Sequence, residues 1–180
     1  MVRSVGLSPR DAKTLYDYNR TVFEKFERRV RRLPGRGAFR KRGIGHESFF
    51  DTLVHVLNVH EVWLVYIVRG RTSDAELKDL FGDASRHPKD WKGFRAYAKR
   101  VWSGVDATIA GFTPRSLGAP VQIFWMPGRY TIRDAVLQAT IEQAHHLGEM
   151  IGAYWQEDHE FPDMTWIDIG RFLDGRARRR

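Results

Sequence analysis

Residues 48–69 read SFFDTLVHVLNVHEVWLVYIVR, and this stretch decides the fold. Its apolar residues recur every three or four positions, which is typical of the buried face of an α-helix. They are Phe49, Leu53, Val56, Val59, Trp63 and Ile67. Gly70 follows as a stop signal, so the pattern predicts a helix from about Ser48 to Arg69.

Three other stretches repeat this periodicity and predict three more long helices. The first covers about residues 8–32, with Ser8 as N-cap and Pro9 at the first helical position. The next covers about residues 88–110. The last covers residues 131–156, and Asp134 stands three residues after Thr131, as in a capping box.

Four long amphipathic helices with two longer crossovers predict an all-α four-helix bundle, formed as a single domain over residues 1–180. Residues 121–125 alternate in polarity, and Pro127-Gly128 is a turn signal, so a short extended or β-like arm should precede the last helix. The smaller expected elements are a loop over residues 111–118, a short helix after the cap at residues 72–74, and another helix over residues 163–173.

The composition excludes several classes of protein. None of the 180 residues is cysteine, which excludes disulfides, zinc ribbons and thiol nucleophiles. No apolar run approaches the roughly 20 residues of a membrane span. The first residues, MVRSVGLSPRD, lack the apolar centre of a signal peptide. We therefore expect no membrane partner and a cytoplasmic location.

The net charge of +8 comes from two local patches. Residues 28–42 hold eight basic residues and no acidic one, and residues 176–180 hold four arginines. A solvated connection over about residues 34–46 and a basic tail explain this charge; docking of anions or nucleic acid is the alternative. Since no helix-turn-helix or zinc-finger pattern is present, we expect no specific DNA site.

Three residues on the predicted helices suggest a metal site. Glu142 and His146 are four residues apart and so share one helix face, while His55 lies on the second helix. Two imidazoles and a carboxylate with open positions suit zinc, nickel or ferrous iron. The plain alternative is a surface Glu–His pair and a histidine hydrogen-bonded locally. His60, beside Glu61, is expected on the surface.

The segments LYDYNRTVFEKF, SFFDTLVHVLNVHEVWL and QAHHLGEMIGAYWQ, in this order, resemble the DinB/YfiT-like superfamily. The resemblance extends over about residues 8–160. Its most specific parts are a histidine followed by an acid and Trp-Leu on the second helix, and an HxGE pattern followed by Trp-Gln on the fourth. These residues are His55, Glu61, Trp63 and Leu64, then His146, Gly148, Glu149, Trp155 and Gln156.

The resemblance implies a four-helix bundle that binds a divalent metal through three histidines, one on the second helix and two, four apart, on the last. His55 and His146 match two of these positions, and Glu142 stands where many members have histidine. Known enzymes of the superfamily include transferases and isomerases that use low-molecular-weight thiols. The implied protein is a metal-dependent enzyme, a thiol-dependent transferase or isomerase or a hydrolase, with Glu149 as a proton acceptor or as a partner of His146.

Two other functions remain open at this stage. One is a non-enzymatic binding protein that meets nucleic acid through its basic connection. The other is a structural homodimer with a vestigial metal site, in which Phe124 and Trp125 would suit an interface or the core equally. The enzyme reading implies a small-molecule substrate, and a homodimer is expected with either function.

Overall fold

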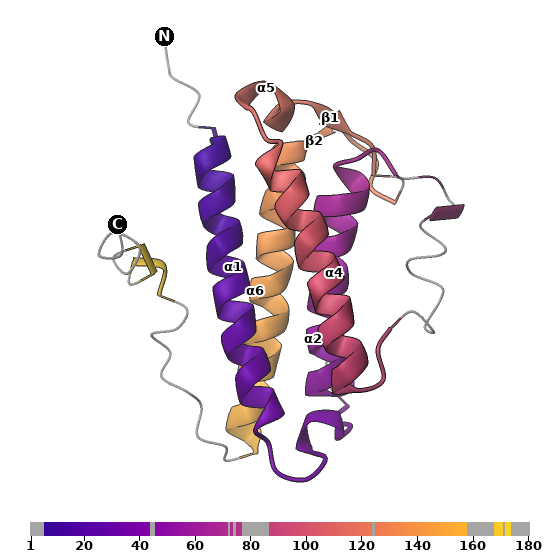
Figure 1. The fold of residues 1–180 in the computed structure, drawn as a ribbon, viewed down its shortest axis with the longest axis vertical. Coiled ribbons are helices and arrows are strands. Elements are labelled where there is room, and N and C mark those ends of the chain that lie inside the picture. Colours follow the sequence, from indigo (N-terminus) through magenta and orange to yellow (C-terminus); the bar gives the residue numbers. More distant parts are fainter. Residues whose placement is uncertain are drawn as a thin grey trace.

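Four long helices form the structure, which is a computed structural model (Figure 1). It describes residues 6–43, 46–71, 73, 75–76, 87–123, 125–157, 168–170 and 172–173. The long helices are α1 (Pro9–Arg31), α2 (Phe49–Glu61), α4 (Trp91–Ala110) and α6 (Ile132–Gln156). The predicted all-α bundle is confirmed. The short helices expected after residue 74 and from residue 163 lie largely outside the described residues.

Side-chain caps explain where the helices begin. The Ser8 hydroxyl accepts a hydrogen bond from the Asp11 amide, and the Asp11 carboxylate accepts one from the Ser8 amide. Thr131 and Asp134 form the same reciprocal pair at α6, as the sequence predicts. Asp90 caps α4 by accepting from the Gly93 amide, so this helix begins three residues later than Pro88.

The second helix continues beyond Glu61 in a different geometry. Residues Val62–Ile67 form a π-helical segment, so the predicted single helix is an α-helix followed by wider turns. Hydropathy periodicity does not distinguish the two, because both segments keep their apolar side chains buried. Such π-helical turns are rare and often lie near functional sites.

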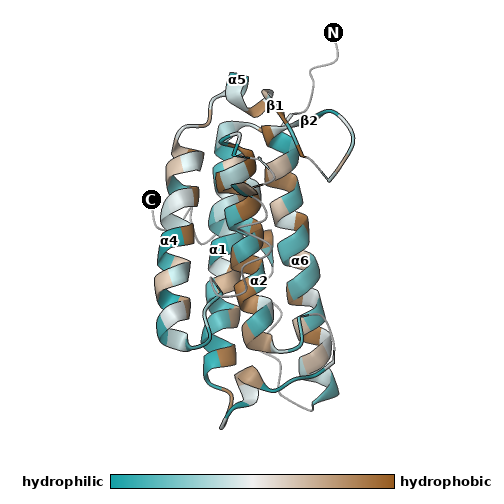
Figure 2. Cartoon of the chain, turned by 90° about the vertical axis from the view of Figure 1, so that its right-hand side faces the viewer, coloured by the Kyte–Doolittle hydropathy of each residue, from teal (hydrophilic) through white to brown (hydrophobic). Residues whose placement is uncertain are grey.

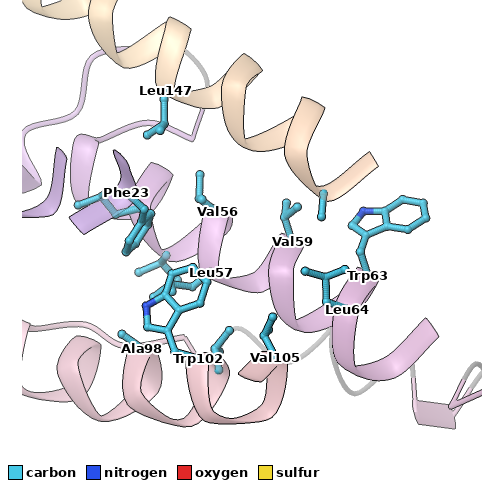
Figure 3. Packing of buried hydrophobic residues seen from close by; sticks show 14 of the residues in the cluster. Phe23, Val56, Leu57, Val59, Trp63, Leu64, Ala98, Trp102, Val105 and Leu147 are labelled. Carbon is cyan, nitrogen blue, oxygen red and sulfur yellow. The ribbon is translucent and has the colours of Figure 1, made fainter. Parts of the chain in front are cut away.

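The core is one cluster of buried side chains contributed by all four long helices. Helix α2 packs against α1, α4 and α6. Figure 3 shows part of this packing, in which Leu57 and Trp102 face one another from α2 and α4, and Leu147 approaches α2 from α6. The outer faces of α4 and α6 are largely hydrophilic in Figure 2. In the described part of the chain, none of the helices combines the length and the hydrophobicity that crossing a membrane requires.

A small ribbon and a short helix join α4 to α6. Strands β1 (Pro120–Val121) and β2 (Tyr130–Thr131) pair antiparallel, which confirms the extended arm as a two-stranded ribbon. The loop expected over residues 111–118 is corrected, because it contains α5 (Pro114–Leu117). Thr113 caps this helix, and Leu117 is fully buried. The cap and the burial of Leu117 together stabilise a helical turn where the sequence suggested a loop.

Arg42 fastens the connection between α1 and α2 to the end of α6. Its guanidinium donates to both carboxylate oxygens of Glu157, at 2.7 and 3.1 Å, and lies 3.7 Å over the Phe49 ring. It also donates to the carbonyl oxygens of Gly37 and Arg40. The Arg42 side chain is only 5% exposed, so this part of the basic connection belongs to the folded core.

Replacing Arg42 by alanine should therefore lower the free energy of unfolding by about 2–3 kcal/mol. The variant loses several charge-assisted hydrogen bonds and leaves the carboxylate of Glu157, itself only 16% exposed, without its main partner. Arg32→Ala is the matched control, since Arg32 is exposed, and should change stability by less than about 0.5 kcal/mol. Urea unfolding followed by circular dichroism measures both; equal losses would contradict the role given to Arg42.

A candidate metal centre

Three histidines from three parts of the chain converge beside α2. His55 lies on α2, His146 on α6, and His46 in the connection just before Ser48, the N-cap of α2. One ring nitrogen of each lies within 4.8 Å of those of the other two. Thus the structure brings together two of the three residues predicted from the sequence, His55 and His146, and adds His46.

The ring arrangement is close enough for one ion. His46 stacks on His55 with ring centroids 3.6 Å apart, and His146 meets His55 edge-on at 4.5 Å. Zinc binds imidazole nitrogen at about 2.0–2.1 Å, so two tetrahedral ligand nitrogens lie about 3.4 Å apart. Binding of one ion would draw the three nitrogens, which lie within 4.8 Å of one another, to about this separation. The donor set therefore fits a divalent ion that prefers nitrogen ligands.

Burial keeps the rings of His46 and His55 neutral, as metal ligands must be. It lowers the pKa of His55 to about 3, and the neighbouring His46 and His146 act in the same direction. Burial also lowers the pKa of His46, again with help from His146. At neutral pH both rings therefore carry an unprotonated nitrogen that is available for an ion.

Glu149 holds the third imidazole in one orientation. Its carboxylate oxygen lies 2.9 Å from Nδ1 of His146, so this nitrogen carries the hydrogen and Nε2 remains free to bind an ion. A carboxylate in this position is the usual partner of a metal-binding histidine. His145, His146 and Glu149 form a second possible group on α6, but it uses the same two residues, and the His145 side chain is 65% exposed.

Glu142 does not join the three histidines. It shares a helix face with His146, as its spacing predicts, but its Oε1 accepts hydrogen bonds from Nε1 of Trp63 at 3.0 Å and from Gln138 at 2.8 Å. Neither of the two possible metal groups among the described residues contains Glu142. The carboxylate expected as a ligand is thus engaged on the side of α6 that faces Trp63.

The prediction that His60 lies on the surface is wrong. His60 is fully buried and its Nε2 lies 2.7 Å from Oε1 of Gln143, whose own amide donates to the carbonyl oxygen of Asn19. Glu61 is 8% exposed and accepts a hydrogen bond from the Tyr97 hydroxyl. Because α2 packs against three helices, polar residues outside its apolar stripe are also covered.

His46 is the site residue that sequence reasoning missed. It stands in a glycine-rich connection without periodicity, so no local pattern assigns it a face. Its position depends on the chain reversal before α2: the His46 carbonyl accepts from the Ser48 amide, and the Arg42 amide donates to the Glu47 carbonyl. Glu47 has a left-handed backbone with φ of 65°, which marks the tight bend that directs the connection.

Comparison with known proteins identifies one matching family model. The family model described as the DinB superfamily matches residues 18–150, which include His46, His55 and His146. Among curated proteins, none matches the chain.

Proposed function

Because the chain belongs to the DinB superfamily, we propose that it is a divalent-metal-dependent enzyme whose ion is held by His46, His55 and His146. The observation that carries this proposal is the convergence of three imidazole nitrogens within 4.8 Å of one another. It departs from the ligand set suggested by the sequence, because His46 takes the place of Glu142. His55 and His146 are common to both sets.

Three nitrogen ligands with an open position are typical of catalytic rather than structural sites. Zinc, nickel and ferrous iron all suit such a donor set, and zinc is the first to test. When bound, the ion would lower the pKa of a water molecule or a thiol and supply a nucleophile near neutral pH. Hydrolysis or transfer to a small thiol would use this nucleophile, and thiol-dependent transfer and isomerisation are the reactions that the resemblance to the superfamily implies.

The chain's own residues prepare the site for that ion. His46 and His55 present neutral rings, because burial opposes their protonation. Glu149 fixes His146 with Nε2 free, which favours a positioning role over the alternative role of proton acceptor. Arg42 anchors the connection that bears His46, and so limits the freedom of the ligand that no helix holds.

The alternative is a structural homodimer with a vestigial metal site. Its support is a row of exposed apolar side chains on α6, where Leu137, Ile141 and Trp155 are 39, 62 and 61% exposed. Contact with nucleic acid has less support, since Arg42 is occupied by Glu157. A homodimer is compatible with the enzyme as well, so oligomeric state alone does not separate the two functions.

Metal content and turnover measured together test the proposal. Untagged protein should bind about one Zn²⁺ per chain in titration calorimetry, and His55→Ala should abolish stoichiometric binding. His145→Ala, at an exposed neighbour of His146, should keep it. The zinc-loaded protein should accelerate hydrolysis of 4-nitrophenyl acetate, or conjugation of mercaptoethanol to chlorodinitrobenzene, in proportion to metal content. Full metal binding with no acceleration over His55→Ala in either assay would favour the vestigial site.

A further inference from the structure

A cavity of about 370 Å³ lies against two of the three histidines. His46 and His55 form one part of its wall, and the segment that precedes α4 forms another. Its remaining lining residues are Glu47, Asp51, Val54, His87, Pro88 and Lys89. The volume is within the range of small-molecule sites, about 300–1,000 Å³. A molecule in this cavity would border the rings that we propose as metal ligands.

The two acidic residues of the lining are already engaged. The carboxylate of Glu47 lies 2.6 Å from the ammonium of Lys41, which neutralises it. Asp51 accepts a hydrogen bond from the Ser48 hydroxyl, and its amide donates to that hydroxyl in the cap of α2. The Glu47 carboxylate is therefore paired with Lys41, whereas Asp51 keeps its negative charge and its Oδ2 is held in the cap of α2.

Lys89 and His87 differ from these acids because their polar groups are not engaged. Within the described part of the chain, the ammonium of Lys89 has no hydrogen bond or ion pair. Nε2 of His87 is buried and likewise has no hydrogen-bond partner among the described residues. A buried nitrogen without a partner is costly, and a ligand with acceptor oxygens would satisfy it. The lining thus offers a ligand one ammonium and one imidazole nitrogen that have no partner among the described residues.

We propose that this cavity is the substrate pocket of the enzyme and that it takes a small molecule with an anionic group, a carboxylate or a phosphate, paired with Lys89 beside His87. The inference rests on the proposed function, since the ion would hold the reacting end of the same molecule. Lys89 is an exposed residue at the cavity wall, so its attraction for an anion is that of a charge pair near the protein surface. Lys89 would then determine which substrates bind well, while the three histidines determine the chemistry.

Two thiols that differ by one charge test this pocket in the Co²⁺-loaded protein. Mercaptoacetate and mercaptoethanol offer the same sulfur donor, but only mercaptoacetate carries a carboxylate. We expect the protein to bind mercaptoacetate about tenfold more tightly, as for one charge-assisted hydrogen bond, with binding followed by near-ultraviolet absorption. Lys89→Met should remove the preference and Lys89→Arg should keep it. Lys92→Met, at an exposed lysine of α4 outside the lining, should behave as the unaltered protein.

The outcomes separate this inference from the proposed function. If the preference for mercaptoacetate survives in Lys89→Met, the ion alone binds both its sulfur and its carboxylate. That result would overturn the role given to Lys89. If Co²⁺ does not bind at all, the proposed function fails, and metal-free ¹⁵N-labelled protein is titrated with acetate and with inorganic phosphate instead. Amide shifts around Lys89 that vanish in Lys89→Met would support an anion pocket and identify the preferred anion. Amide shifts that persist in Lys89→Met, or the absence of any shift in the unaltered protein, would overturn the anion pocket.

Discussion

Replacing His46 by alanine should weaken Zn²⁺ binding on the order of 100-fold or more, although His46 lies outside every helix of the bundle. Removing even a hydrogen-bond partner of a ligand commonly costs about 10–100-fold in metal affinity, and a direct ligand should cost at least as much. The remaining His55 and His146 would bind an ion only weakly. Competition against a chromogenic zinc chelator measures the change.

Comparing zinc binding by Glu142→Ala with that by His46→Ala distinguishes the two possible ligand sets. The carboxylate of Glu142 is engaged by Trp63 and Gln138, so its removal should change zinc affinity by less than about threefold. Glu142→His, which introduces the residue that the resemblance suggests at this position, also faces Trp63 and should not weaken binding. If Glu142→Ala loses zinc while His46→Ala keeps it, the ligand set is His55, Glu142 and His146, as the sequence suggests.

Acidification should destabilise the protein through His60, which is not one of the proposed ligands. Its ring is fully buried, and burial lowers its pKa from 6.5 to about 4. Gln143 and Trp102, which contact the ring, carry no charge that could compensate an imidazolium. The unfolded chain therefore takes up a proton below pH 6.5 that the folded chain does not. Stability is unaffected above pH 6.5 and falls as the pH decreases toward 4.

The size of this effect can be isolated with one variant. One pKa unit corresponds to about 1.4 kcal/mol, so His60 should cost about 2 kcal/mol between pH 6.5 and pH 5. His55 acts in the same direction in the metal-free protein, so the comparison must be with His60→Gln, which keeps an amide donor for Gln143 and does not titrate. Urea unfolding at pH 7 and pH 5 should show the smaller loss in this variant. Equal losses of stability in the two proteins would refute the role given to His60. An NMR titration of His60 with a midpoint near pH 6.5 would refute it as well.

The helices were predictable because their signals are local. Apolar residues at three- and four-residue spacing give each helix, and the caps at Ser8 and Thr131 give their starts, as the structure confirms. The same spacing failed for His60 on α2, which is fully buried. A helix packed against three others buries most of its circumference, whereas periodicity identifies only the strongest stripe.

The candidate site was only partly predictable, because its geometry depends on contacts between distant segments. Spacing correctly places Glu142 and His146 on one face of α6, but four residues also separate them by about 6 Å along the axis. That distance brings Glu142 to Trp63 and leaves His146 beside His55. His46 reaches the same point from an aperiodic connection, and neither composition nor periodicity predicts such a contact.

The mixed origin of the three histidines has a kinetic consequence. His55 and His146 belong to packed helices, which separate only when the bundle unfolds, whereas His46 belongs to a connection held chiefly by the contacts of Arg42. Local opening of such a segment costs far less free energy than global unfolding. An ion bound to all three would therefore be exchanged through transient release of His46, at a rate set by the opening of this connection rather than by the lifetime of the folded bundle.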